Sequence, residues 1–160
     1  LKRLDALRSV GMGLSMVDFI RSADFPCVGA KSALARGNIE YFEADRIESP
    51  ASDLPLYKAI CSFNEKLDLD SPVVQSFVTL FSHPSKLDEK AFEAALWNRL
   101  QCLHNIDAAA GQEWARDVAA DPNSPHFSLS IGGTAYFVIG LHPGASRAAR
   151  RFSLPSPDRL

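Results

Sequence analysis

The sequence has no long apolar run and few cysteines, and both shortages narrow what the chain can be. No stretch of about 18 apolar residues occurs, so we expect no membrane span. The first ten residues carry no apolar signal core, which gives secretion no support. The three cysteines lack a CxxC spacing, which argues against a disulfide framework or a structural zinc site. A reducing cytoplasm is therefore the expected location.

Positive charge is not in excess either. Seventeen Lys and Arg stand against nineteen Asp and Glu, a net charge of −2, which argues against a nucleic-acid binder. The charges are unevenly placed, because residues 40–70 hold eight acids and three bases whereas residues 144–160 hold four arginines and one acid. We expect the C-terminal stretch to favour an anion.

The composition is that of a globular protein. Apolar residues make up 46% and charged residues 22% of the 160 residues, which excludes a disordered or collagen-like chain. This length predicts a single domain over residues 1–160 that buries a core of its own. The sequence contains no P-loop, G-x-G-x-x-G, G-x-S-x-G or H-E-x-x-H motif, so no common catalytic signature assigns a reaction.

Apolar residues at helical spacing predict several helices after a loose, basic entry over residues 1–11. The expected segments are residues 14–21, residues 30–36 ended by Gly37, a helix that begins near Pro55, a helix from the start pattern Ser85–Asp88 to about Asn105, and residues 112–119.

Strands are predicted where β-branched and aromatic residues gather. Residues 39–42 and 73–81 each form such a run. The clearest signal is the alternation from Phe127 to Ile131, the Gly132–Gly133 pair, and the apolar run over residues 135–141, which together predict an antiparallel hairpin. The expected fold class is α+β, with a small antiparallel sheet, a C-terminal hairpin and helices packed on it.

Three places carry residues suited to chemistry. Cys27 lies between a Phe-Pro break and a helix start, where a thiol can become a nucleophile or an iron ligand; the alternative is a small buried cysteine. His142 leaves the predicted second strand of the hairpin, as an iron ligand or a hydrogen-bonded turn residue. His104, which shares a helix flank with Trp97, is the third candidate for chemistry. The alternative is that it is a hydrogen-bonded histidine at the edge of the core.

An arginine-rich stretch follows His142 directly. Ser146, Arg147, Arg150 and Arg151 suit carboxylates or haem propionates, because the guanidinium group donates two parallel hydrogen bonds; a solvated basic turn is the alternative.

Four segments resemble the YqcI/YcgG family, over about residues 19–152. They are Phe25–Lys31, Leu96–Gln101 with Leu103-His104, Phe127–Gly133 and Val138–Arg147, of which the GLHPxASR stretch is the most specific. The resemblance predicts a chain that lacks the C-terminal part usual in the family.

The resemblance implies a function that composition and periodicity do not show. Some members are associated with haem-dependent N-hydroxylation of guanidino groups, as in the guanitoxin and cycloserine pathways. It implies a b-type haem and a small guanidino or amino-acid substrate. The candidate catalytic residues are then Cys27 and His104. The candidate cofactor-binding residues are Lys31, His142, Ser146, Arg147, Arg150 and Arg151.

We expect His142 to be the iron ligand, with Cys27 as the alternative, and Cys27 to be buried in the pocket. Two other functions stay open. One is a non-catalytic protein that binds or senses haem. The other is a haem-free thiol enzyme that uses Cys27.

Overall fold

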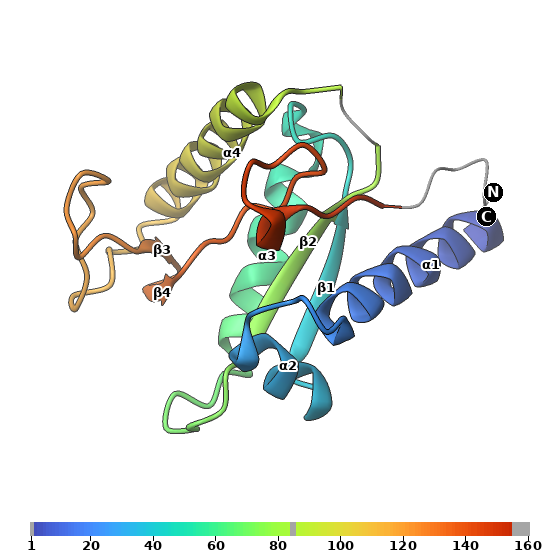
Figure 1. The fold of residues 1–160 in the computed structure, drawn as a ribbon. Helices are drawn as coiled ribbons and strands as arrows, with labels where there is room; N and C mark the ends of the chain where they lie inside the picture. The colour runs from blue at the N-terminus through green and yellow to red at the C-terminus, as the bar shows by residue number, and fades with distance from the viewer. Residues whose placement is uncertain (1, 84–85, 155–160) are drawn as a thin grey trace.

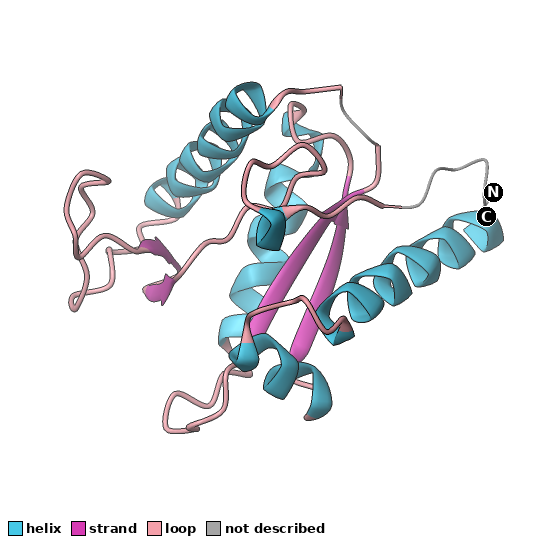
Figure 2. Ribbon diagram, viewed as in Figure 1, coloured by secondary structure: helices cyan, strands magenta, loops and turns pink. Residues whose placement is uncertain are grey.

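The computed structural model describes residues 2–83 and 86–154, and its described part is an α+β fold (Figures 1 and 2). The helices and strands are α1 (Lys2–Arg21), α2 (Val28–Ala35), β1 (Ile39–Ala44), η1 (Pro50–Ser52), α3 (Asp53–Asn64), β2 (Ser76–Phe81), α4 (Glu89–Ala109), β3 (Leu129–Ile131), β4 (Thr134–Tyr136) and η2 (Ala148–Arg150). No helix of the described residues is long and apolar enough to cross a membrane. The α+β class and the C-terminal hairpin are confirmed.

The first two helices are present, and α1 is longer than the sequence predicts. It begins at Lys2, so a loose entry over residues 1–11 is wrong. This stretch contains no proline, so nothing in it interrupts the backbone hydrogen bonds of the helix. Met12, Met16 and Ile20, four residues apart, form the buried side of α1, whereas Leu14 is exposed. After α2 the chain turns at Gly37, whose φ is +69°.

The two predicted strands 39–42 and 73–81 exist and pair with each other in parallel. The register runs from Ile39 opposite Ser76 to Ala44 opposite Phe81. A parallel pair needs a crossover connection, which α3 supplies. The ends of both strands, followed by Asp45 and Ser82, therefore lie at one edge.

Helix α4 starts at a cap, as predicted, but at a different residue. The side chain of Asp88 accepts a hydrogen bond from the Ala91 amide at 2.8 Å. Ser85, the predicted capping residue, lies outside the described residues. The helix continues to Ala109 and the chain turns away at Gly111, whose φ is +78°.

The predicted helix over residues 112–119 is wrong. After the turn at Gly111 residues 112–118 are irregular, and the Ala115 amide donates to Ser130 Oγ at 2.9 Å. Ala119 then forms an isolated bridge with Phe127. These contacts with the β3 region satisfy backbone groups that a helix would pair internally.

The predicted hairpin is confirmed, with shorter strands. Leu129 lies opposite Tyr136, and the turn is made by Gly132 and Gly133 at φ +57° and +74°, which only glycine adopts freely. The second strand ends at Tyr136 instead of residue 141, because β3 begins at Leu129 and offers no partner further on. The following Phe137 is 82% exposed.

Two apolar clusters hold the elements together. One joins α3, α4 and the hairpin through Leu56, Tyr57, Ile60, Leu103, Leu129 and Ile131. The other joins α1 and β2 through Met12, Met16, Ile20 and Leu80. Phe25 and Ala30 near the start of α2, and Leu141 and Phe152 near the C-terminus, also pack on this second cluster.

Candidate functional site

The segment over residues 142–151 is folded around its own histidine. The His142 amide donates to the Arg150 carbonyl at 2.9 Å, which closes the segment into a loop. The ring stacks on Phe92 of α4, with centroids 4.8 Å apart and an interplanar angle of 28°. Its Nδ1 accepts a hydrogen bond from the Gly144 amide at 3.1 Å. His142 is 8% exposed, so it is a buried turn histidine with its δ nitrogen engaged.

The arginines of this segment divide into two kinds. Arg151 holds the loop itself, because its Nε donates to the Ala145 carbonyl at 2.7 Å and its Nη2 to the Ser146 carbonyl at 3.0 Å. Among the described residues, Arg147 and Arg150 form no ion pair with an acidic side chain. Their guanidinium groups are therefore the ones available to an anion.

Glu89, in the first turn of α4, ties the segment to the helix. Its Oε1 accepts from the Ser146 amide at 2.9 Å and from the Ser146 hydroxyl at 3.0 Å. These two hydrogen bonds lower the pKa of Glu89, and the nearby His142 and Arg151 lower it further. The Ser146 hydroxyl is thus hydrogen-bonded to Glu89, a residue that no sequence pattern marks.

Cys27 is exposed, so its predicted burial in a pocket is wrong. It is the N-cap of α2, and its Sγ accepts from the Ala30 amide at 3.4 Å. A capping side chain sits outside the helix and reaches its first amides, so this place leaves the thiol toward solvent. Lys31, one turn on, donates through Nζ to the Ser22 carbonyl at 2.9 Å.

His104 belongs to an aromatic group between α4 and the hairpin. Its ring meets Trp114 edge-on with centroids 5.3 Å apart, and Trp97 packs on Phe127 at 6.0 Å. The buried Nδ1 of His104 and Nε1 of Trp114 have no hydrogen-bond partner within the described part of the chain. His104 thus lies with Trp114 on the first apolar cluster, whereas the segments of Cys27 and His142 both flank the second.

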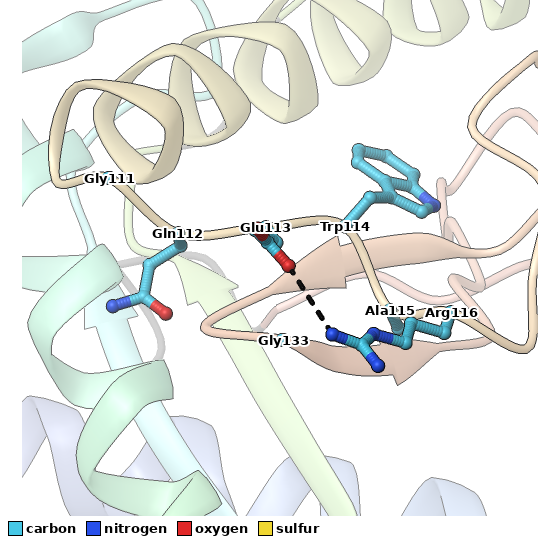
Figure 3. A pocket seen from close by; sticks show the side chains of 7 residues that line it. All are labelled: Gly111, Gln112, Glu113, Trp114, Ala115, Arg116 and Gly133. Carbon is cyan, nitrogen blue, oxygen red and sulfur yellow. Dashed lines mark ion pairs between the residues drawn. The ribbon is translucent and has the colours of Figure 1, made fainter.

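A hollow of about 510 Å³ opens beside Trp114, near the hairpin turn (Figure 3). On its rim Glu113 and Arg116 form an exposed ion pair at 3.9 Å. The lining contains none of the residues that the sequence predicts for a site; it consists of Gly111, Gln112, Glu113, Trp114, Ala115, Arg116 and Gly133.

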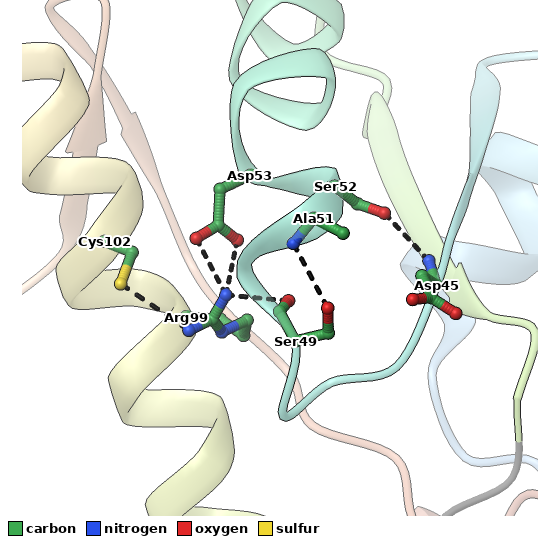
Figure 4. A network of polar contacts seen from close by, with 7 residues as sticks. All are labelled: Asp45, Ser49, Ala51, Ser52, Asp53, Arg99 and Cys102. Atoms are coloured by element: carbon green, nitrogen blue, oxygen red, sulfur yellow. Dashed lines mark hydrogen bonds and ion pairs between the residues drawn. The ribbon is translucent and has the colours of Figure 1, made fainter.

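A buried ion pair joins the start of α3 to the middle of α4, a contact that no sequence pattern predicts. Arg99 of α4 donates through Nη1 to both carboxylate oxygens of Asp53 at 2.7 Å and to the Ser49 carbonyl at 2.8 Å (Figure 4). Its Nη2 reaches Cys102 Sγ at 3.6 Å. The side chains of Arg99 and Asp53 are 5% and 10% exposed, so this network fixes α3 against α4.

Asp45 and His83 form a second polar contact, at the carboxyl ends of β1 and β2. His83 Nδ1 lies 2.8 Å from Asp45 Oδ1 and 3.3 Å from Ser82 Oγ. The Asp45 amide donates to Ser52 Oγ at 2.9 Å, which holds the residue against the start of α3 (Figure 4). His83 stands next to a proline in the sequence, and no local signal predicts its pairing with a residue 38 positions earlier.

The described residues contain no group of three or more His, Cys, Asp or Glu placed to hold a metal ion.

Comparison with known proteins gives the family. The chain belongs to the YqcI/YcgG family, whose model matches residues 16–156. It is 28% identical over 134 residues to the Uncharacterized protein YcgG of Bacillus subtilis (strain 168). The matched region covers 80% of this chain and 51% of that protein. The chain thus spans about half the length of this curated relative. No solved structure matches it.

Proposed function

We propose that this chain is part of a haem-dependent monooxygenase that hydroxylates a guanidino nitrogen of an arginine-like substrate. The resemblance of the GLHPxASR stretch to the family supports the choice of reaction. The structural observation that carries it is the 142–151 segment, which presents Arg147 and Arg150 on an anchored loop, without acidic partners in residues 2–83 and 86–154.

The anchoring matters because a fixed loop loses little conformational entropy when an anion binds. Arg151 and Glu89 hold the backbone of the loop, so Arg147 and Arg150 are left for a ligand. Haem propionates or the carboxylate of an amino acid have the planar shape and charge that a guanidinium group binds best.

The predicted ligand His142 does not fit iron in its observed conformation. A backbone amide can only donate, so the Gly144 amide requires a lone pair on His142 Nδ1. In the neutral ring the proton then lies on Nε2, which makes Nε2 a hydrogen-bond donor instead of a ligand. His142 is suited to donate to a bound anion.

Cys27, the alternative ligand, has a sulfur atom that can coordinate iron. Its Sγ accepts a hydrogen bond from the Ala30 amide at the start of α2. The thiol is exposed and is thus within reach of a large group.

When bound, haem would supply the activation of oxygen. The residues of this chain would do the rest. Arg147 and Arg150 would hold a carboxylate, and the Nε2–H of His142 would donate to an anion beside them.

The test is product formation by the purified chain supplied with haemin, a reductant, oxygen and L-arginine. We expect mass spectrometry to find N-hydroxylated arginine. The double variant Arg147→Ala/Arg150→Ala should lose tenfold or more in kcat/KM, since each charge-assisted hydrogen bond contributes about 1.5–3 kcal/mol. Arg36→Ala, an exposed arginine at the end of α2, is the control. Haem binding without product would indicate a carrier or sensor instead.

A haem-free thiol enzyme is the second candidate, because Cys27 is exposed at a helix start. It predicts activity in colourless protein that iodoacetamide abolishes and that Cys27→Ser lacks. Haem-dependent activity that survives Cys27→Ser would exclude it.

A further inference from the structure

His83 is a histidine to which nothing so far assigns a role, and it lies where folds with parallel strands often place a site. Asp45 directly follows β1 and His83 comes two residues after β2, so both stand at the carboxyl edge of the parallel pair. Leu80, the second-last residue of β2, packs in the same cluster as Leu141 and Phe152. These two residues flank the 142–151 segment.

The neighbours of His83 determine which ring nitrogen carries the proton. Asp45 Oδ1, 2.8 Å from Nδ1, can only accept. The Ser82 hydroxyl donates to the Ala44 carbonyl at 3.0 Å, so its oxygen offers lone pairs to the same Nδ1 at 3.3 Å. Both neighbours of Nδ1 accept, hence in the neutral ring Nδ1 bears the proton and Nε2 bears the lone pair.

His83 and His142 are therefore opposite in their chemistry. The Gly144 amide gives His142 a lone pair at Nδ1 and a proton at Nε2. The Asp45 carboxylate accepts from His83 Nδ1–H, which leaves the lone pair of the neutral ring on Nε2. Histidines that bind metals characteristically donate their other N–H to a carboxylate or a carbonyl, which orients the ring and raises its basicity. Of these two histidines, only His83 has this arrangement.

We infer that His83 ligates the haem iron through Nε2 and that Asp45 is its positioning residue; the inference rests on the proposed haem function. The His83 side chain is 46% exposed, so a large planar group can approach it. Haem brings four ring nitrogens of its own, and one imidazole is enough protein ligation for oxygen chemistry. This agrees with the absence of a three-residue metal group among the described residues.

The proton assignment can be tested without haem. Nitrogen-15 NMR of the labelled chain should show His83 with a protonated Nδ1 and His142 with a protonated Nε2. Asp45→Asn should shift His83 toward the other tautomer, and His126, an exposed histidine, serves as the reference. A His83 ring protonated at Nε2 in the unmodified chain would overturn the inference.

The ligand itself is tested by titrating the chain and its variants with haemin, followed by absorbance and electron paramagnetic resonance. We expect an imidazole-type spectrum that His83→Ala loses, while His126→Ala keeps it. Asp45→Asn should weaken haemin binding about 10–100-fold, the usual effect of removing a carboxylate behind a metal-bound histidine. Circular dichroism of each variant verifies that it is folded.

The outcomes separate the two proposals. The chain could bind haem with a thiolate-type spectrum that Cys27→Ser removes. This result would overturn the role of His83 but would agree with the proposed haem function. Equal haemin binding by the unmodified chain and by His83→Ala would do the same. Failure of the unmodified chain to bind haemin would overturn the haem function, and the role of His83 as its ligand with it.

Discussion

Arg99 of α4 and Asp53 at the start of α3 form a buried ion pair in which one guanidinium nitrogen lies 2.7 Å from both carboxylate oxygens. Removing one partner leaves the other charge buried and unpaired. We expect Asp53→Ala to lower the free energy of unfolding by about 3–5 kcal/mol. Urea denaturation measures this loss.

The exposed pair of Lys66 and Glu40, 2.6 Å apart, is the matched control. Exposed ion pairs contribute about 0–1 kcal/mol, so Glu40→Ala should change stability little. Equal effects of the two substitutions would contradict the structural role of the buried pair.

The hairpin turn allows a second matched comparison. Gly132 and Gly133 both have positive φ, so alanine at either position is strained by about 1–2 kcal/mol. At Gly132 the added Cβ would also come within 2.9 Å of Asn64 Nδ2, whereas at Gly133 no described residue beyond its chain neighbours lies within 4 Å. Asn64 cannot easily move, because it donates to the Ile131 carbonyl at 2.9 Å and accepts from the Tyr136 hydroxyl.

We therefore expect Gly132→Ala to destabilise the chain more than Gly133→Ala in thermal or urea denaturation. The difference measures the contact of the turn with α3. Equal losses would mean that the hairpin is not held against Asn64 in solution.

All three tyrosines of the chain are shifted in the same direction. Burial raises the pKa of Tyr41 and of Tyr57 above the ordinary value of 10.0, and for Tyr57 the hydrogen bonds with Cys61 and Asp107 add to it. Burial, with the nearby Cys61 thiol, raises the pKa of Tyr136 to about 12. A raised pKa stabilises the fold below the unfolded value, and this contribution is lost as pH rises toward the folded value.

Stability should therefore fall from about pH 10 to about pH 12, and tyrosinate absorbance should appear only as the fold is lost. An alkaline titration followed by absorbance and circular dichroism measures both. In urea, all three tyrosines should ionise near pH 10. A tyrosine that ionises near pH 10 while the circular dichroism stays native would contradict the burial described.

The cysteines should react in the order of their exposure. Cys27 is exposed, whereas Cys61 and Cys102 are half-buried. With a thiol reagent in limiting amount, mass spectrometry should find the label on Cys27 first. Cys27→Ser should remove this fast phase. A fast phase on Cys102 instead would mean that Arg99 does not cover its thiol.

Local signals in the sequence predict the local structure well. Gly132–Gly133 marks the hairpin turn, and Gly37 marks the end of α2, because these positions need a positive φ that glycine adopts freely. The helix over residues 112–119 is wrong because its amide groups pair with Ser130 and His126, partners that no local pattern shows.

The chemistry of the side chains was harder to predict, since it depends on partners far along the chain. Glycine and proline around His142 suggest a turn, but only the structure shows the Gly144 amide on its Nδ1. His83 and Arg99 carry no signal of their own, because Asp45 and Asp53 meet them only after α3 and β2 have folded. The Phe-Pro break before Cys27 predicts a helix start correctly, and a capping side chain is exposed by its position.

The central claim is that this chain binds haem, and the most direct measurement is the haem content of chain purified from cells supplied with a haem precursor. The account predicts a coloured protein with about one haem per chain, from the single iron ligand proposed. It further predicts that His83→Ala is colourless under the same conditions. A colourless unmodified chain that stays folded and takes up no added haemin would contradict the account.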